Sequence, residues 1–311
     1  MGKITSMSKT RIAWFNGAYM PETQVMISFR DRGWKYGDGA FDMTRTFNGR
    51  AFRMKEHVER FYRSLRYLRL DPGMSPQEMI DISEEIVVRN EPLRAAAGDW
   101  WIAQRVSRGV DPIEGDEPGH VGPNVIVECA PLPLKARARL YRDGIDVWTP
   151  AHRRVGPDML SPRAKSHNYL NMIVAEQTVK AHDADGWAIL LDPQGNLAEG
   201  IGSNIFLVRD GKLFTPAEKY VLPGVSRQMT LDLAAKLGIP AVEGDLDLFD
   251  AANADEMFLT STSLCIAGVR RFNGAAVGDG SSPGPVTKRL MDAYSAEVGC
   301  DFVQQYLDRL G

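Results

Sequence analysis

Two stretches decide how this chain is interpreted: SPRAKSHNYL at residues 161–170 and LAEGIGSNIF at residues 197–206. In the first stretch, Lys165 lies where an extended segment containing a proline meets a predicted helix. A lysine amine that is partly removed from water favours its neutral form, which can attack a carbonyl carbon. In the second stretch, Glu199 precedes two nearby glycines, which allow the backbone to approach a flat ligand closely. Together they predict a site for covalent carbonyl chemistry with an acidic partner.

Pyridoxal 5'-phosphate is the cofactor that best matches these groups, because it needs a lysine, an acid beside its ring nitrogen and an anion site for its phosphate. Two stretches offer that anion site. LPGVSR at residues 222–227 begins a predicted helix, whose N-terminal N–H groups suit a phosphate, and TSTS at residues 260–263 offers hydroxyl groups. Arg60 would add a bidentate guanidinium. Each signal alone is more simply a surface residue, a turn or a cap, so the prediction depends on their combination.

The composition excludes several other classes of protein. The chain has 311 residues, of which 44% are apolar and 25% are charged, and its net charge is -3. This balance argues against nucleic acid or a membrane surface as a partner. The three cysteines are scattered and odd in number, and no apolar stretch is long enough to span a membrane, so we expect a cytoplasmic protein. Nucleotide P-loop and metal-ligand motifs are absent from the sequence, so no metal is expected.

Local patterns predict a mixed set of strands and helices. Asn16-Gly17 and Asn48-Gly49 each separate apolar runs and predict hairpins, because both turn residues tolerate positive φ. Apolar residues at three-to-four spacing predict a helix near residues 58–68, and Ser75-Pro76 begins another that extends to about Asn90. Strands are expected at 100–107, 124–129, 145–149, 187–191, 204–208, 212–215 and 256–259, and helices at 168–181, 226–237 and from residue 286 onward.

The sequence PLPL at residues 131–134 predicts a domain boundary, since two alternate prolines suit neither a helix nor a central strand. We therefore expect a small N-terminal α/β domain over residues 1–130, an interdomain linker over 131–140 and a larger C-terminal domain over 141–311.

From about Trp14 to the C-terminal helix, the chain resembles the class IV (fold type IV) aminotransferases. This group includes branched-chain aminotransferases, D-amino acid aminotransferases, (R)-selective amine transaminases and aminodeoxychorismate lyase. The motifs that carry the resemblance are YGDGAFD at 36–42, HVER at 57–60, RAK at 163–165, NYLN at 168–171, LDP at 191–193, AEG at 198–200, NIF at 204–206, LPGVSR at 222–227 and GPVTKR at 284–289.

The resemblance implies a two-domain α/β (α+β) fold with pyridoxal phosphate in the cleft between the domains, and a homodimer or higher homo-oligomer. It also implies a role for each matching residue. Lys165 would bind the cofactor covalently and move a proton, Glu199 would pair with the ring nitrogen, and Tyr169 would donate to the phenolic oxygen of the ring. The residues that would hold the phosphate are Arg60, Val225, Ser226, Ser261 and Thr262.

The expected substrate pocket departs from the relatives. The resemblance places Ala103 where branched-chain enzymes keep an arginine that binds the substrate carboxylate, and Arg105 lies two residues on, on the same side of a strand. Arg45 resembles another pocket arginine of that group, and Tyr36 and Phe41 would line the same pocket. The Arg-x-His carboxylate trap of the D-amino acid enzymes is absent from the sequence.

These observations predict a transaminase that moves an amino group from a hydrophobic, branched-chain-like amino acid or amine to a 2-oxo acid by a ping-pong mechanism. The alternative is an (R)-selective amine or D-amino acid transaminase, since the standard carboxylate clamp is missing. A lyase similar to aminodeoxychorismate lyase, or an inactive homologue, is a less favoured reading, because Lys165, Glu199 and Arg60 are all retained.

Overall fold

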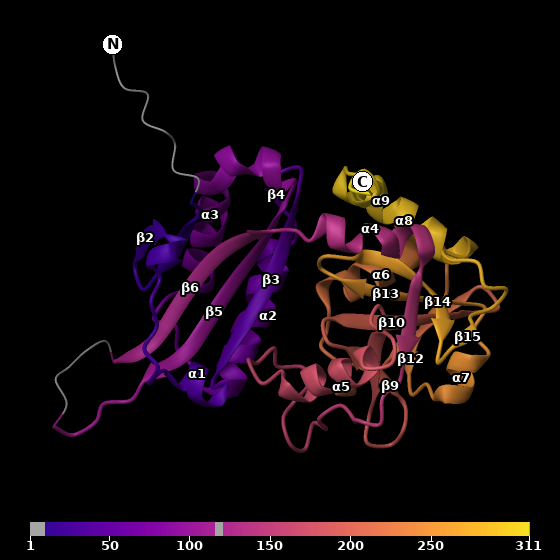
Figure 1. Cartoon of the computed structure of the whole chain (residues 1–311), viewed down its shortest axis with the longest axis horizontal. Coiled ribbons are helices and arrows are strands. Elements are labelled where there is room, and N and C mark those ends of the chain that lie inside the picture. The colour runs from indigo at the N-terminus through magenta and orange to yellow at the C-terminus, as the bar shows by residue number, and fades with distance from the viewer. Residues whose placement is uncertain (1–9, 116–120, 311) are drawn as a thin grey trace, which may run out of the picture. The chain divides into compact units, whose positions relative to one another are not determined.

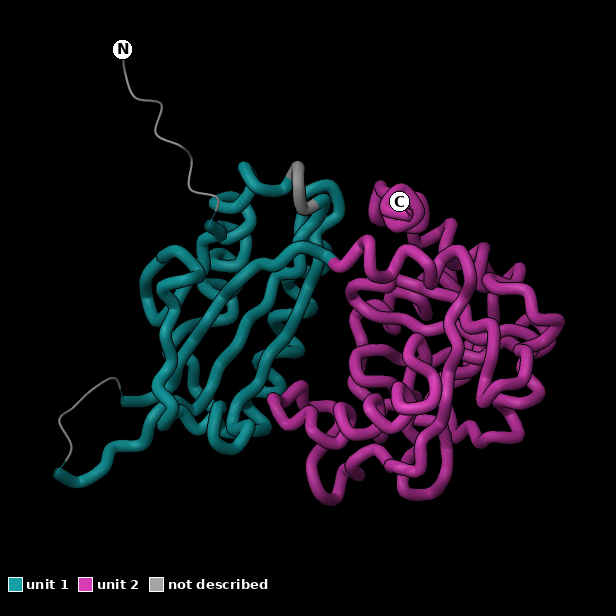
Figure 2. Tube along the Cα trace, in the orientation of Figure 1, with its two compact units in different colours: residues 1–132 teal, residues 133–311 magenta. Residues whose placement is uncertain are grey.

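The computed structural model describes residues 10–115 and 121–310, and the chain divides into two compact units, Met1–Leu132 and Pro133–Gly311 (Figure 2). Each unit has its own sheet, and helices accompany both sheets (Figure 1). The predicted α/β class is therefore confirmed.

Unit 1 contains a six-stranded sheet in the order β2-β1-β6-β5-β3-β4, in which every pairing is antiparallel. Both Asn-Gly hairpins are present, and Asn16, Gly17, Asn48 and Gly49 all have positive φ. The strands are β1 (Ile12–Phe15), β2 (Ala18–Pro21), β3 (Gly39–Phe47), β4 (Arg50–Ala51), β5 (Trp100–Val110) and β6 (Gly122–Pro131).

Helices α2 (Met54–Leu68) and α3 (Pro76–Ala97) pack against one face of this sheet (Figure 1). The core between them is made of buried side chains such as Val58, Phe61 and Leu65 from α2 and Ile102 and Val106 from β5. Ser75 begins α3 as predicted, in a capping box with Glu78, but the helix continues past Asn90 and includes Pro92. The shorter elements of the unit are η1 (Glu22–Gln24) and α1 (Arg32–Tyr36).

The division between the units falls at Leu132, inside the predicted proline-rich segment. The expected linker over 131–140 is wrong in its second part, because Leu134–Asp143 forms helix α4. Leu134, Ala138 and Tyr141 are buried on one side of α4, and the ring of Tyr141 stacks on Tyr306. An apolar helical face that is buried in this way belongs to unit 2 rather than to an extended connection.

Unit 2 contains a mixed sheet in the order β12-β11-β10-β13-β14-β7-β8-β9. Because β9 also pairs with β10, six of these strands close into a ring. The strands are β7 (Ile145–Trp148), β8 (Trp187–Leu191), β9 (Leu197–Gly200), β10 (Ser203–Arg209), β11 (Lys212–Pro216), β12 (Ala241–Gly244), β13 (Glu256–Ser261), β14 (Cys265–Phe272) and β15 (Ala275–Ala276), of which β15 pairs with β14.

The helices of unit 2 lie around this sheet. Helix α5 packs beside β8, while α6 and α8 pack beside β13. They are α5 (Leu170–Lys180), η2 (Glu218–Tyr220), α6 (Val225–Lys236), α7 (Leu248–Ala252), α8 (Pro285–Val298) and α9 (Phe302–Leu307). The predicted helices near 168–181, 226–237 and beyond 286 are thus confirmed, with small differences at their ends.

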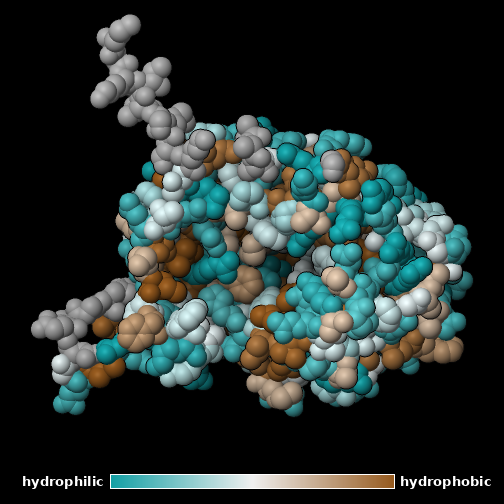
Figure 3. Space-filling view, viewed as in Figure 1, coloured by the Kyte–Doolittle hydropathy of each residue, from teal (hydrophilic) through white to brown (hydrophobic). Residues whose placement is uncertain are grey.

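The surface shown in Figure 3 is largely hydrophilic, with separate hydrophobic patches. Among the described residues, no helix is both long and apolar enough to cross a membrane.

Candidate active site

Lys165 lies in the irregular segment between β7 and α5, and its side chain is half-buried. Its Nζ atom donates a hydrogen bond to the hydroxyl group of Tyr169, at 3.1 Å. Tyr169 follows Lys165 by four residues and lies immediately before α5, so the start of that helix holds the phenol in place. The structure therefore brings the predicted nucleophile and the predicted ring-oxygen partner into contact.

Glu199 lies on β9 and is almost fully buried, and both of its carboxylate oxygens are held. Arg154 Nε donates to Oε1 at 2.9 Å, and the backbone N–H of Leu222 donates to Oε2 at 2.9 Å. The two bonds fix the plane of the carboxylate, whose remaining lone pairs can accept from a protonated ring nitrogen.

Arg154 was missed by sequence reasoning. Its position depends on a contact with a strand far along the chain, since the N–H of Arg154 donates to the carbonyl of Leu191 in β8 at 2.8 Å. Nothing in the local spacing of residues 152–156 indicates that this arginine pairs with Glu199. Only the closed arrangement of the sheet reveals the partner.

The N-terminus of α6 has the form expected of an anion site. Its N-cap residue is Gly224, which has no side chain to cap the helix, and Val225 and Ser226 form the first turn. A Cβ atom on the preceding residue, Gly224, would lie 2.2 Å from Oδ1 of Asn204, so a side chain there would displace the Asn204 amide. Asn204 in turn donates to the carbonyl of Leu222 at 3.0 Å, which holds the loop before the helix.

Strand register brings the acid and the hydroxyl-rich turn to neighbouring strands. Glu199 of β9 pairs with Asn204 of β10, which pairs with Thr260 of β13. Ser261 and Thr262 follow directly, at the turn between β13 and β14. Residues more than fifty positions apart therefore meet along three adjacent strands.

The turn after β13 is held by two helices. Ser261 Oγ accepts from the N–H of Leu264 at 3.0 Å. Arg137 of α4 donates to Ser263 Oγ, and the hydroxyl of Tyr306 in α9 donates to the Ser263 carbonyl. Tyr141 of α4 donates to the Leu264 carbonyl. Burial lowers the pKa of Arg137 despite the neighbouring tyrosines. Sequence reasoning found the turn but not the side chains that support it.

In unit 1, Arg60 lies on the buried side of α2 and pairs with Asp42 of β3. Its Nε donates to Oδ2 at 2.8 Å and its Nη2 donates to Oδ1 at 2.7 Å. His57, one turn earlier, places Nδ1 2.7 Å from the same Oδ1. The contact of Arg60 with a phosphate stays a prediction.

The residues predicted to line the substrate pocket also lie in unit 1. Phe41 of β3 is directly opposite Arg105 of β5, and Arg45 is opposite Trp101, so these side chains share one face of the sheet. Arg45 is buried, with its guanidinium 4.0 Å from the Phe47 ring. The side chain of Arg105 is partly exposed, whereas that of Arg45 is buried.

Arg105 donates to Oε1 of Glu128 on β6 at 2.8 Å, and its guanidinium lies 5.5 Å from the Phe41 ring. A substrate carboxylate would therefore compete with Glu128 for Arg105.

Tyr36 ends α1 and is exposed. Asp31 caps the start of this helix, accepting from the N–H of Gly33 at 2.6 Å. The same carboxylate accepts from Ser107 and Asn124, both at 2.6 Å, which anchors α1 to the sheet.

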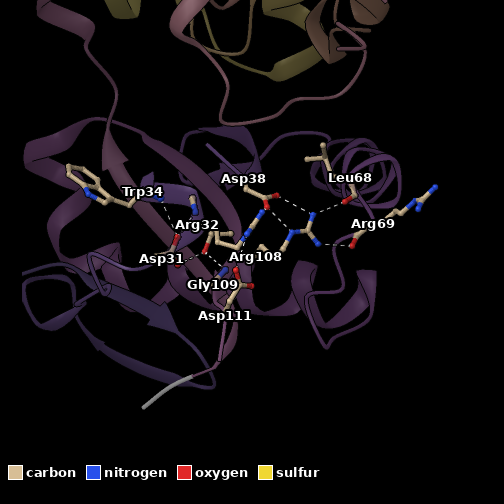
Figure 4. Close-up of polar contacts among 11 residues, drawn as sticks. Asp31, Arg32, Trp34, Asp38, Leu68, Arg69, Arg108, Gly109 and Asp111 are labelled. Atoms are coloured by element: carbon tan, nitrogen blue, oxygen red, sulfur yellow. Dashed lines mark hydrogen bonds and ion pairs between the residues drawn. The ribbon is translucent and has the colours of Figure 1, made fainter. Parts of the chain in front are cut away.

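The segment after Tyr36 is tied to the end of α2 (Figure 4). Asp38 accepts from Nε of Arg32 at 2.9 Å and from Nε of Arg108 at 2.8 Å. Arg108 also donates to the carbonyls of Leu68 and Arg69, at the end of α2. Although burial works to raise the pKa of Asp38, the hydrogen bonds from Arg108 and Arg32 hold it below its ordinary value.

Comparison with known proteins identifies the class. Residues 39–272 match the family described as Amino-transferase class IV. A putative branched-chain-amino-acid aminotransferase of Methanocaldococcus jannaschii is 36% identical over 283 residues, covering 90% of this chain and 94% of that protein. A D-alanine aminotransferase of Staphylococcus haemolyticus is 30% identical over 289 residues, covering 92% and 97%.

Solved structures agree. The crystal structure of the Escherichia coli branched-chain amino acid aminotransferase superposes with a TM-score of 0.83 at 28% identity, covering 92% of this chain and 94% of that one. Another branched-chain amino acid aminotransferase, from T.th. and complexed with N-(5'-phosphopyridoxyl)-L-glutamate, gives a TM-score of 0.81 at 28% identity, covering 93% and 94%. The chain therefore belongs to the class IV aminotransferases, and it is an aminotransferase.

Proposed function

We propose that this protein uses pyridoxal 5'-phosphate to transfer an amino group from a hydrophobic, branched-chain-like amino acid to a 2-oxo acid, in two half-reactions. The observation that carries the proposal is that two functional groups in unit 2, an amine and a carboxylate, are held in place by hydrogen bonds. The amine of Lys165 is bonded to Tyr169, and the carboxylate of Glu199 is fixed at both oxygens.

The donor set in unit 2 fits this cofactor. An amine is available for its aldehyde, and a carboxylate is available for its ring nitrogen. The uncapped N-terminus of α6 and the hydroxyl-rich turn after β13 suit its phosphate. A solved relative that contains a phosphopyridoxyl group supports the same assignment.

Each residue has a separate task in the proposed reaction. Bound pyridoxal phosphate supplies an electron sink for the α-carbon of the amino donor. Lys165 holds the cofactor and then takes the proton from that α-carbon. Glu199 keeps a proton on the ring nitrogen, while Arg154 and the N–H of Leu222 keep Glu199 in place. Val225, Ser226, Ser261, Thr262 and Arg60 anchor the phosphate, and Tyr169 donates to the phenolic oxygen of the ring.

The substrate class rests on different observations. Relatives named as branched-chain aminotransferases favour a hydrophobic donor. Phe41 and Tyr36 offer apolar surface, and Arg105 offers a guanidinium for a carboxylate. A relative named as a D-alanine aminotransferase makes D-amino acids the first alternative donors to exclude.

We further propose that the protein is cytoplasmic and acts as a homodimer. Large apolar side chains are exposed along residues 26–36 of unit 1, including Met26, Phe29 and Trp34. Exposed apolar side chains gathered in one segment are typical of a surface that another chain covers.

The decisive test is the Lys165→Ala variant. We expect it to lose the near-visible absorbance of the bound cofactor, borohydride trapping of the cofactor on the peptide, and nearly all turnover. The matched control is Lys180→Ala at the exposed end of α5, which should retain all three. Transamination at the wild-type rate by Lys165→Ala would contradict the proposal.

The half-reactions separate a transaminase from a lyase. A donor alone should bleach the absorbance, and a 2-oxo acid should restore it. A screen with both enantiomers of branched-chain amino acids, alanine and 1-phenylethylamine then identifies the donor. Protein that takes up no added cofactor would point to an inactive homologue.

A further inference from the structure

Asp42, His57 and Arg60 form a buried cluster of ionisable side chains in unit 1. The side chains of Asp42, His57 and Arg60 are exposed by 0%, 2% and 4%. The cluster joins β3 to α2, and apolar core residues such as Val58 and Phe61 are its neighbours on α2. A buried ionic cluster of this kind is a poor source of stability, because desolvation offsets most of the attraction between the charges.

The geometry of Asp42 fixes the guanidinium of Arg60. One carboxylate oxygen accepts from Nε at 2.8 Å and the other from Nη2 at 2.7 Å, which is the bidentate arrangement. Asp42 is itself held, because Oδ1 also accepts from the N–H of Met43 at 2.7 Å and lies 2.7 Å from Nδ1 of His57. Neither partner can rotate without breaking several hydrogen bonds.

The bonds to Asp42 set the orientation of the Arg60 guanidinium. They engage Nε and Nη2, and Nη2 also lies 3.4 Å from Nδ1 of His57. Two bonds to one carboxylate fix the guanidinium plane and therefore the directions of its N–H groups. Asp42 thereby sets the orientation of Arg60 before any ligand binds, which lowers the ordering cost of binding.

Charge supports the same conclusion. Burial alone would raise the pKa of Asp42, but Arg60 and His57 outweigh it and hold the pKa far below its ordinary value, so the carboxylate is ionised at neutral pH. The negative charge of ionised Asp42 cancels most of the electrostatic attraction that Arg60 would exert on a distant anion. Arg60 then acts on an anion through directed hydrogen bonds more than through net positive charge.

We propose that Asp42 is a positioning residue for the phosphate of pyridoxal 5'-phosphate, acting through Arg60, with His57 as the second support of Asp42. This proposal rests on the proposed function, because it takes the phosphate as the ligand of Arg60.

The test compares two aldehydes that differ only in the phosphate. Apoprotein is titrated with pyridoxal 5'-phosphate and with pyridoxal, and the ratio of the two dissociation constants gives the phosphate preference. We expect Asp42→Asn to reduce this preference about tenfold, because Arg60 would lose the charge-assisted hydrogen bonds that orient it toward the phosphate. The dissociation constant of pyridoxal should stay unchanged. Asp38→Asn is the matched control, since Asp38 also pairs with arginines of unit 1 but should leave the preference unchanged.

The outcomes separate the two proposals. Equal weakening of both aldehydes by Asp42→Asn would show a merely structural role, and a higher phosphate preference would show that net charge matters more than direction. Either result overturns the positioning role and leaves the transaminase proposal intact. Wild-type protein that binds neither aldehyde would instead overturn the proposed function.

A second pair of variants covers a failure of Asp42→Asn to fold. Arg60→Met removes the guanidinium, and the double variant Asp42→Asn/Arg60→Met leaves no buried charge of this pair. If Asp42 acts through Arg60, the single and double variants have the same phosphate preference. A further fall in the double variant would overturn the proposal.

Discussion

At the scale of single residues, the two candidate carboxylate anchors differ in what they touch. Arg45 is buried over the Phe47 ring and donates to the carbonyl of Thr46 at 3.1 Å. Arg105 is partly exposed, and its contacts described above are with Glu128 and the Phe41 ring. An exposed ion pair of this kind contributes roughly 0–1 kcal/mol, so a substrate carboxylate can replace Glu128 at little cost.

We therefore expect Arg105→Ala to raise KM for amino acids about tenfold while changing KM for simple amines little, because only amino acids present a carboxylate. Steady-state kinetics with leucine and with 1-phenylethylamine check this expectation. Glu128→Gln is the control that keeps Arg105 and removes its competitor, so it should lower KM for amino acids. An equal effect of Arg105→Ala on both substrates would remove Arg105 from this role.

At the scale of elements, tertiary contacts contribute more to the stability of short helices than their intrinsic helix propensity does. Helix α1 has five residues, too few to be stable alone. Asp31 caps its start, and Asp38 ties its end through Arg108 to the last carbonyls of α2. Tyr36 is thus presented by a helix that tertiary contacts hold in place.

We expect Asp38→Asn to destabilise unit 1 by roughly 1–2 kcal/mol at neutral pH, since two arginines lose a charged acceptor. The pKa of Asp38 is lower in the folded state, so its contribution is complete above the unfolded pKa, about 3.9, and is lost as the pH falls through the folded value. Urea denaturation at several pH values should show the difference between wild type and variant shrinking under acid conditions.

The matched control for Asp38 is Asp111→Asn. Asp111 accepts from Arg32 at 2.8 Å but is largely exposed, so its loss should change the free energy of unfolding by less than about 0.5 kcal/mol. A difference between wild type and Asp38→Asn that stays constant with pH would contradict the assigned ionic contribution.

At the scale of the whole molecule, the proposed homodimer predicts a sedimenting mass of twice 34.5 kDa. We expect the double variant Phe29→Ser/Trp34→Ser to shift the protein toward monomer, because it removes two exposed apolar side chains from the segment 26–36. Sedimentation velocity at several concentrations measures the shift.

Phe249→Ser, at an equally exposed phenylalanine of α7 in unit 2, is the control and should leave the dimer unchanged. Wild-type protein that sediments as a monomer at all concentrations would contradict the dimer proposal.

Features that depend on neighbours along the chain could be predicted from the amino-acid sequence. The Asn-Gly turns require positive φ, the spacing of Val58, Phe61 and Leu65 gives α2 its buried face, and the motifs around Lys165 and Glu199 identify the class of enzyme. These signals are local, so they remain readable without any three-dimensional information.

Features that depend on contacts between distant segments became visible in the folded chain alone. The apolar run that forms β14 could have been noticed, but its central place in the sheet follows from pairing with both β13 and β7. The supporting contacts of Arg154 to Glu199, of Asp42 to Arg60 and of Tyr306 to the turn after β13 likewise join distant parts of the chain. Such contacts are set by strand register and helix packing, and no pattern of adjacent residues encodes which side chains will meet.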